Sequence, residues 1–298
     1  MNWAGAAILS AGTSAAVSIF DSHLITRRLP GMRSFILMVG IFHIVPSLIF
    51  MALFPLPAGV SINIVLLTLL SGIIRTVSIL ILFYCLTKEE VSRVVPVTST
   101  YPVFVAILAV PLLGEHLSSL EWLAIFIVVA GAITISFRQS PSGSFILNRL
   151  TALLFLSSLF MAVADLISKY VLGFISFWNV FWLEALLVSS VFLVISARPL
   201  VFRQIVQVKQ KLSGFILFVA DELFAIVGLI LATWSRAEGP VSLVSTITSS
   251  RPMFVLIYAL ILSRFLPGFL AWQSGSWVLI LRIIGIVMIV GGLAIIYL

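Results

Sequence analysis

The chain has 298 residues, of which 62% are hydrophobic and 9% are charged, and its mean hydropathy is +1.27. A soluble domain is about half apolar and about a quarter charged, so this chain cannot cover itself with a polar surface. The net charge of +7 would suggest a nucleic-acid partner in a soluble protein. Here the basic residues gather in loops between apolar segments, and we expect no nucleic-acid partner.

Apolar segments of about twenty residues, the length with which a helix crosses about 30 Å of hydrocarbon, recur from one end of the chain to the other. The alternating polarity of transmembrane β-strands is absent from the sequence. We therefore predict an all-α polytopic membrane protein in contact with the lipid bilayer. Its ten transmembrane helices are expected at residues 3–25, 34–53, 63–86, 91–112, 120–137, 149–172, 176–196, 214–235, 240–262 and 278–297.

One stretch of sequence occurs twice. Residues 91–109, VSRVVPVTSTYPVFVAILA, match residues 241–259, VSLVSTITSSRPMFVLIYA, at ten of nineteen positions with a constant offset of 150. The matches include a Thr-Ser pair and a proline, Pro102 in one copy and Pro252 in the other. The pattern indicates a tandem duplication, with one five-helix repeat at residues 1–139 and a second at residues 144–298.

The basic residues predict the topology. Of 17 Lys and Arg residues, 13 lie in or beside odd-numbered loops, whereas Lys169 and Arg236 lie on the other side. Basic loops stay in the cytoplasm, so we expect a multi-pass protein of the cytoplasmic membrane with both termini extracytoplasmic. Because five is an odd number of helices, the second repeat must insert upside down relative to the first, which gives an inverted repeat.

With this organisation the chain resembles the ten-helix, EamA-like branch of the drug/metabolite transporter superfamily. Leu112-Leu113-Gly114-Glu115 matches the Leu-Gly-Glu signature of that family, and Ala130-Gly131 and Gly291-Gly292 match its closing helices. The second half departs from the pattern, because Ser263-Arg264-Phe265 replaces Leu-Gly-Glu. The resemblance implies a carrier with a central substrate cavity between helices 1, 3 and 4 and helices 6, 8 and 9, working by alternating access.

Charged residues inside the spans point to a hydrated interior independently of the family. A charge at the bilayer centre costs at least about 2.5–3.5 kcal/mol, so each is expected to be paired or to face water. The candidates for the substrate cavity are Arg75, Thr98, Ser99, Tyr101, Pro102, Asp165, Trp182, Glu184, Asp221, Glu222, Ser249, Arg251 and Pro252.

Each group of candidates has a structural alternative. A proline frees a backbone carbonyl, and Pro102 and Pro252 lie beside hydroxyl residues that would bind a substrate weakly and reversibly. The alternative is a kink that only shapes helix packing. Tyr101 and Trp182 are aromatic side chains that would stack on a substrate, whereas aromatic residues near helix ends often belong to the interfacial belt. His43 is expected to be a hydrogen-bonded packing residue.

Three acidic residues are candidates for proton coupling, namely Glu184, Asp221 and Glu222. Burial disfavours the charged form of a carboxyl group, so such a group can bind and release a proton near neutral pH. The alternative is a static ion pair with Arg75 or Arg251. Asp165 and Lys169 are spaced i, i+4, and we expect them to pair on one helix face.

These observations predict a secondary transporter, either facilitative or proton-coupled, and not an enzyme, with no cofactor and no metal. Arginines can meet a carboxylate and acids can meet an amine, so an amino acid or a related zwitterion is the preferred small-molecule substrate. A multidrug or lipid-precursor exporter of the same superfamily is the alternative, and a membrane scaffold is the reading without transport. The sequence is compatible with a monomer or a homodimer.

Overall fold

The computed structural model describes residues 2–86, 88, 94, 97–136, 149–206, 211–265 and 276–297, and these residues contain helices and no strand. The helices, in chain order, are α1 (Trp3–His23), the π-helical turn η1 (Leu24–Arg28), α2 (Met32–Leu53), α3 (Ile62–Leu86), α5 (Tyr101–Leu113), α6 (Ser119–Ser136), α7 (Arg149–Val171), α8 (Phe177–Ser196), α9 (Pro199–Val206), α10 (Lys211–Glu238), α11 (Val241–Thr248), α12 (Arg251–Phe265) and α13 (Ser276–Ile296). Nine segments of the described chain, with α11 and α12 counted together, are long and apolar enough to cross a membrane, and α5 is a shorter apolar helix. The predicted all-α polytopic fold is confirmed.

The predicted spans and the observed helices differ in three places. The span expected at residues 240–262 is two helices, α11 and α12, separated by a turn. The short helix α9 was not expected. The beginning of the span at residues 91–112 lies partly outside the described residues, and its continuous helix α5 begins only at Tyr101.

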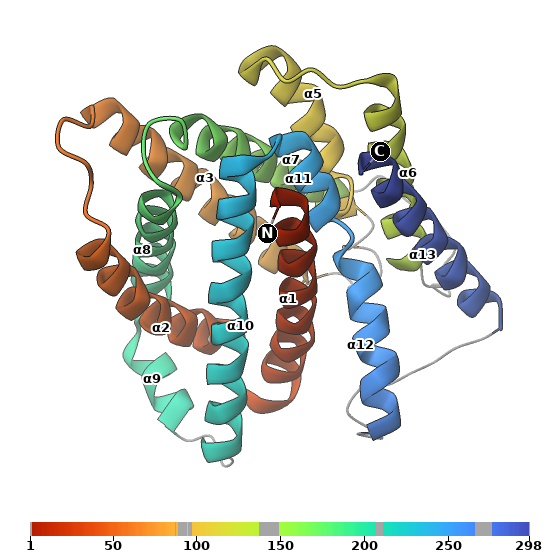
Figure 1. Cartoon of the computed structure of the whole chain (residues 1–298). Coiled ribbons are helices and arrows are strands. Elements are labelled where there is room, and N and C mark those ends of the chain that lie inside the picture. The colour runs from red at the N-terminus through yellow and green to blue at the C-terminus, as the bar shows by residue number, and fades with distance from the viewer. Residues whose placement is uncertain are drawn as a thin grey trace.

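The helices pack mainly in pairs formed by one helix from each half of the chain. α1 lies along α10, α3 along α7, α2 along α8 and α6 along α13 (Figure 1). Exchanging the two halves turns the α1–α10 pair into the α7–α3 pair and maps the other two pairs onto themselves. This arrangement is the one that an inverted repeat produces. The predicted repeat boundaries near residues 139–144 lie outside the described residues and stay a prediction.

Small residues allow the closest of these pairs. A Cβ atom on Gly131 of α6 would lie 2.8 Å from the carbonyl oxygen of Gly285 of α13, so no larger residue fits there without a shift. Gly292 approaches α6 in the same way, at Ala124 and Val128, whereas Gly291 faces open space. The backbones of α6 and α13 therefore touch through glycines, as small-residue packing in membranes requires.

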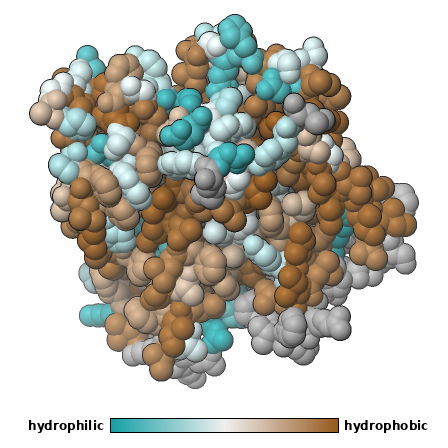
Figure 2. All heavy atoms as spheres, viewed as in Figure 1, coloured by the Kyte–Doolittle hydropathy of each residue, from teal (hydrophilic) through white to brown (hydrophobic). Residues whose placement is uncertain are grey.

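The outer surface is apolar, and polar side chains turn inward. Figure 2 shows a broad hydrophobic face with hydrophilic residues gathered mainly toward the upper end of the molecule. Large apolar side chains such as Ile49, Phe126 and Val287 are exposed, whereas Asp165, Glu184 and Asp221 are buried. An apolar exterior is what lipid contact requires, and it leaves the interior as the place where charges must be satisfied.

Candidate functional site

A break in the second copy of the repeated sequence brings its polar residues into the interior. α11 ends at Thr248, Ser249 and Ser250 form a turn, and α12 begins at Arg251. Pro252 has no N–H and therefore cannot bond the carbonyl of Thr248, four residues earlier. The break therefore leaves the carbonyl of Thr248 without that hydrogen bond, and the guanidinium of Arg251 donates to Ser18 of the neighbouring helix α1.

The first copy is interrupted at the equivalent place. Residues 99 and 100 form a turn, α5 begins at Tyr101, and Pro102 removes the N–H that would bond the carbonyl of Thr98. The Thr98 hydroxyl donates to the carbonyl of Val94 at 3.3 Å. Ser99 and its repeat partner Ser249 are both nearly buried. Both copies are thus interrupted beside the proline where the sequence predicted a freed carbonyl or a kink, and Tyr101 and Arg251 lie at matching positions.

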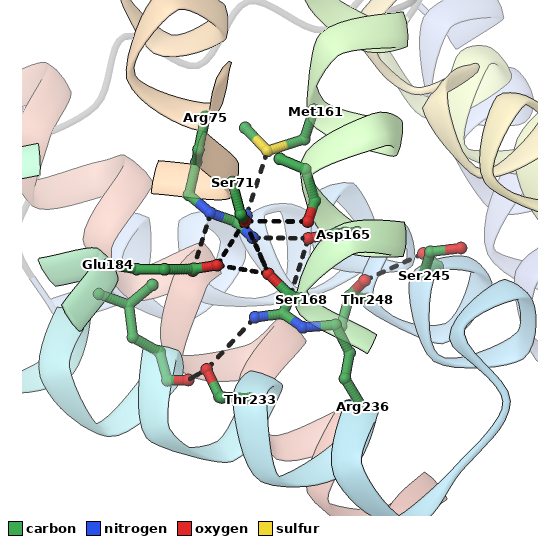
Figure 3. A network of polar contacts seen from close by, with 12 residues as sticks. Ser71, Arg75, Met161, Asp165, Ser168, Glu184, Thr233, Arg236, Ser245 and Thr248 are labelled. Carbon is green, nitrogen blue, oxygen red and sulfur yellow. Dashed lines mark hydrogen bonds and ion pairs between the residues drawn. The ribbon is translucent and has the colours of Figure 1, made fainter. Parts of the chain in front are cut away.

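Two arginines and two acids form the larger group of buried charges. Arg75 of α3 is ion-paired with Glu184 of α8 at 3.1 Å and with Asp165 of α7 at 3.0 Å. Arg236, near the end of α10, is ion-paired with Asp165 at 3.1 Å. The two positive and two negative charges balance. We call this group, with the hydroxyl residues that join it, the arginine-bridged cluster (Figure 3).

Hydroxyl groups complete the arginine-bridged cluster. Ser71 donates to Glu184 at 2.5 Å, and Ser168 donates to the same carboxylate and accepts from Arg75 at 3.2 Å. The Tyr101 hydroxyl donates to Asp165 at 3.1 Å. Separating a buried charge from partners that both neutralise it and hydrogen-bond to it is energetically costly. Glu184, a candidate for proton coupling, therefore has the surroundings of the static ion pair.

The expected i, i+4 pair between Asp165 and Lys169 is wrong. Asp165 turns to the two arginines, and the ammonium of Lys169 donates to the backbone carbonyls of Arg236, Ala237 and Gly239 at 2.8–3.3 Å. Lys169 thereby caps the end of α10, where carbonyls lack partners within the helix. Helical spacing allowed the pair, but stronger partners on neighbouring helices replaced it.

A second group of buried charges carries an excess of acid. His43 of α2 lies 2.6 Å from Glu222 of α10, a hydrogen bond between an imidazole and a carboxylate. Asp221, next to Glu222, is 1% exposed, and neither of its oxygens has a hydrogen-bond donor. Its polar neighbour is another carboxyl group, that of Asp21 of α1. We call Asp21, His43, Asp221 and Glu222 the acidic cluster.

Arg251 lies beside the acidic cluster, and its side chain is exposed at the surface of the protein. Its guanidinium donates to the hydroxyl of Ser18 of α1 and is attracted by the carboxyl group of Asp21, one helical turn further along α1. Within the part of the chain that the structure describes, no carboxylate is ion-paired with Arg251 at the distances seen for Arg75. Arg251 therefore differs from Arg75 and Arg236, whose charges are already neutralised.

Sequence reasoning missed two of these residues. Asp21 was not singled out, and Arg236, one residue beyond the predicted span at 214–235, was counted with a loop. His43 was expected to be a hydrogen-bonded packing residue, and its imidazole is hydrogen-bonded to Glu222. The available signal for Asp21 and Arg236 was a charge within about one helical turn of the end of an apolar segment.

Trp182, expected to contact substrate, lies in a packed region. Its indole N–H donates to the carbonyl of Phe54 at 3.1 Å, and its ring is 5% exposed among apolar residues that include Ile64 and Val171. Here it joins the end of α2 to α8.

Glu115 of the Leu-Gly-Glu motif joins the two halves of the chain. Its carboxylate accepts hydrogen bonds from the backbone N–H groups of Val241, at 2.5 Å, and Ser242, at 3.2 Å, and from the hydroxyl of Ser242. These are the first N–H groups of α11, which have no partner within their helix. Gly114 makes the approach possible with a left-handed φ of 67°.

Comparison with known proteins agrees with this architecture. Residues 1–137 match the model of the EamA-like transporter family. A solved crystal structure of a protein 19% identical in sequence matches with a TM-score of 0.68, over 98% of this chain and 94% of that chain. At this identity the likeness shows the fold alone. No curated protein matches the chain in sequence.

The apolar helices and the family match define a multi-pass membrane transporter. Over residues 1–137, slightly less than half of its length, the chain is similar to the EamA-like transporter family, within the drug/metabolite transporter superfamily. The predicted resemblance is thus confirmed. This is a family of transporters, in agreement with the expectation that the chain is not an enzyme.

Proposed function

We propose that this protein is a secondary carrier that moves a small zwitterionic metabolite, with an amino acid as the preferred substrate, across the cytoplasmic membrane by alternating access. The observation that carries the proposal is Arg251. It is a guanidinium within a span, at the break between α11 and α12, that is exposed at the protein surface and, among the described residues, is held by a serine hydroxyl and not by an ion pair.

Arg251 suits a carboxylate for electrostatic reasons. A charge inside a membrane is expected to be paired or to face water, and Arg75 and Arg236 are already paired with Asp165 and Glu184. The carboxylate-binding role that both Arg75 and Arg251 were expected to share therefore falls to Arg251. A planar guanidinium can hold a carboxylate with two parallel hydrogen bonds, which orients the substrate as well as binding it.

The ammonium group of the substrate would be received by the end of α11. The carbonyl end of a helix carries partial negative charge, and the carbonyl of Thr248 has lost the N–H that Pro252 cannot supply. The Thr248 and Ser249 side chains lie at the same break. A zwitterion bound between this end of α11 and the guanidinium of Arg251 would satisfy both of its charges within a few ångströms.

Alternating access is supported by the two repeat-related helix breaks and by a sequence difference between the halves. Glu115 of the first copy caps α11 of the second copy, whereas the second copy has Ser263-Arg264-Phe265 in its sequence at the matching place. The acidic residue that makes this link is therefore not repeated in the second copy. Rocking of one repeat against the other around a central site is how inverted-repeat carriers work, and both termini are assigned here to the extracytoplasmic side.

A second candidate function is the export of organic cations. The observation in its favour is Asp221, a buried carboxylate without a hydrogen-bond donor, which would attract a cation. The two functions differ in the part of the site that binds, since a zwitterion needs Arg251 and a simple cation is repelled by it.

The proposal is tested by thermal unfolding of the purified protein against amino acids, organic acids, nucleotide sugars and cationic drugs. A ligand at about 100 times its Kd stabilises the folded state by about 2.7 kcal/mol and raises the unfolding midpoint. We expect a shift with amino acids that is lost in Arg251→Ala and kept in Glu238→Gln, an exposed carboxylate at the end of α10. A shift with cationic drugs alone that survives Arg251→Ala would favour the second function, and saturable flux in liposomes separates both functions from a scaffold.

A further inference from the structure

The acidic cluster holds three acids and one histidine, and Arg251 is the arginine that lies beside it, at Asp21, so the charges do not balance. Asp21, Asp221 and Glu222 carry three negative charges when ionised, and Arg251 carries one positive charge. Even a protonated His43 would leave one negative charge over. A net charge within the membrane is costly, so the cluster needs at least one further cation or proton.

The contacts within the acidic cluster indicate where this further cation or proton binds. Glu222 already has His43 as its partner, at 2.6 Å. Asp221 is 1% exposed, has no donor at either carboxylate oxygen, and faces the carboxyl group of Asp21. Two ionised carboxylates have only acceptor atoms and repel each other, whereas one proton between them makes one group a donor and the other its acceptor.

We propose that Asp21 of α1 and Asp221 of α10 share one exchangeable proton, and that this proton and an anionic group of the substrate on Arg251 bind together. The inference rests on the proposed carrier function and names its coupling ion and the residues that hold it. A proton fits the pair better than a metal, because no group of three or more His, Cys, Asp or Glu residues in the described chain is arranged to hold a metal ion.

Arg251 connects the proton to the substrate. Its guanidinium is attracted by Asp21 and donates to Ser18 on the same helix. When the Asp21–Asp221 pair is doubly ionised, Asp21 competes for Arg251 with any carboxylate of the substrate. A proton on the pair weakens that competition and leaves the guanidinium to the substrate, so proton and substrate favour each other's binding by the same factor.

The other charged groups around Asp21 and Asp221 do not supply the positive charge that the pair lacks. Glu222 on α10 adds repulsion to both aspartates and is held by His43 of α2. At the end of α1, Arg28 donates to His23 at 3.3 Å and to Ser213 of α10 at 3.4 Å, so both side chains have other partners. The Asp21–Asp221 contact also joins α1 to α10, one of the pairs formed between the two halves. Protonation therefore acts on a contact between the two halves, and a movement of one half against the other would alter this contact.

The proton itself is the first probe. In infrared difference spectra of the purified protein in lipid, taken between low and high pH, we expect the carbonyl band of a protonated carboxyl group to appear at low pH. The band is expected to be lost in Asp21→Asn and in Asp221→Asn and kept in Asp221→Glu, Glu184→Gln and Glu238→Gln. A band unchanged in both Asn variants, or lost in Glu184→Gln, would overturn the assignment. If an Asn variant does not fold, Asp221→Glu is compared with the unmodified protein instead. The carbonyl band must then be present in Asp221→Glu at a shifted frequency.

Transport provides the second readout. In proteoliposomes with an imposed pH gradient and a mixture of radiolabelled amino acids, we expect accumulation against the amino-acid gradient, with loss of that accumulation in Asp221→Asn. Accumulation driven by a sodium gradient and indifferent to pH would refute the proton. If no amino acid is transported but the infrared band behaves as expected, the proposed substrate fails while the proton site stands, so the two failures can be told apart.

Discussion

The arginine-bridged cluster and the acidic cluster occupy related places in the two halves, but their charges are arranged differently. In the first, a base on α3 meets an acid on α8, Arg75 with Glu184; in the second, an acid on α10 meets a base on α2, Glu222 with His43. The repeat exchanges α3 with α10 and α8 with α2. The two acid–base contacts are thus counterparts in which the acid and the base have exchanged helices.

The swap leaves one cluster satisfied and the other short of positive charge. Tyr101 and Arg251 stand at matching positions of the repeat; Tyr101 donates to Asp165, which two arginines already neutralise. Arg251 adds a charge to the acidic cluster but forms no ion pair of that kind in the described chain. A cluster whose charges are balanced and hydrogen-bonded is suited to hold helices together. A cluster with unbalanced charge is suited to bind a substrate or a proton reversibly.

The largest loss of stability is expected from Arg75→Ala. The substitution leaves Glu184 without a base and Asp165 with Arg236 alone, and removal of one partner of a buried pair costs about 3–5 kcal/mol. Thermal unfolding in detergent measures the effect. A midpoint within error of the unmodified protein would mean that the cluster is not structural.

A smaller loss is expected from Glu184→Gln, because the amide still accepts hydrogen bonds from Ser71 but no longer neutralises Arg75. We expect a cost of about 1–3 kcal/mol. The pH dependence of transport should persist, since coupling is assigned to the other cluster. Proteoliposome flux measured across a pH series checks this, and a flux that no longer responds to pH would return Glu184 to the coupling role. The double variant Arg75→Ala with Glu184→Gln, compared with the two single ones, isolates the energy of the pair.

Glu115→Ala is expected to cost about 0.5–2 kcal/mol, the usual range for loss of a helix N-cap, because α11 then begins without its acceptor. Hydrogen exchange should rise at the amides of Val241 and Ser242 before it rises elsewhere. The matched control is Glu121→Ala, which removes an equivalent capping contact of α6 at Ser118, 2.7 Å long, within one half of the chain. Equal effects of the two variants on transport would argue against a special role for the link between the halves.

The smallest effect on stability is expected from Arg251→Ala. This guanidinium is exposed and donates to one hydroxyl, so we expect a change within about 1 kcal/mol, as for an ordinary single hydrogen bond. Substrate binding should be lost, whereas Arg251→Lys, which keeps the charge but not the planar fork, should weaken it less. Isothermal titration with the substrate found in the unfolding screen measures both. A loss of stability as large as that of Arg75→Ala would remove the distinction between the two clusters.

The sequence by itself determined the class of protein, the positions of most helices and the duplication. Apolar length is a local property, so most of the spans could be placed to within a few residues, and the repeated prolines marked the places where both copies are interrupted. It also singled out Arg75, Asp165, Glu184, Asp221 and Arg251 as charges within the spans, because a charge within an apolar segment stands out against its neighbours.

Only the tertiary structure decided which of these charges meet. Arg75 pairs across more than a hundred residues with Glu184, and His43 pairs with a residue 179 positions away, so no spacing rule connects them. Helical periodicity suggested Asp165 with Lys169, yet a buried carboxylate gains more from two arginines than from one neighbour on its own helix. The pairing between helices distinguished a neutralised cluster from an acidic one, because electrostatic energy depends on distance through space and not along the chain.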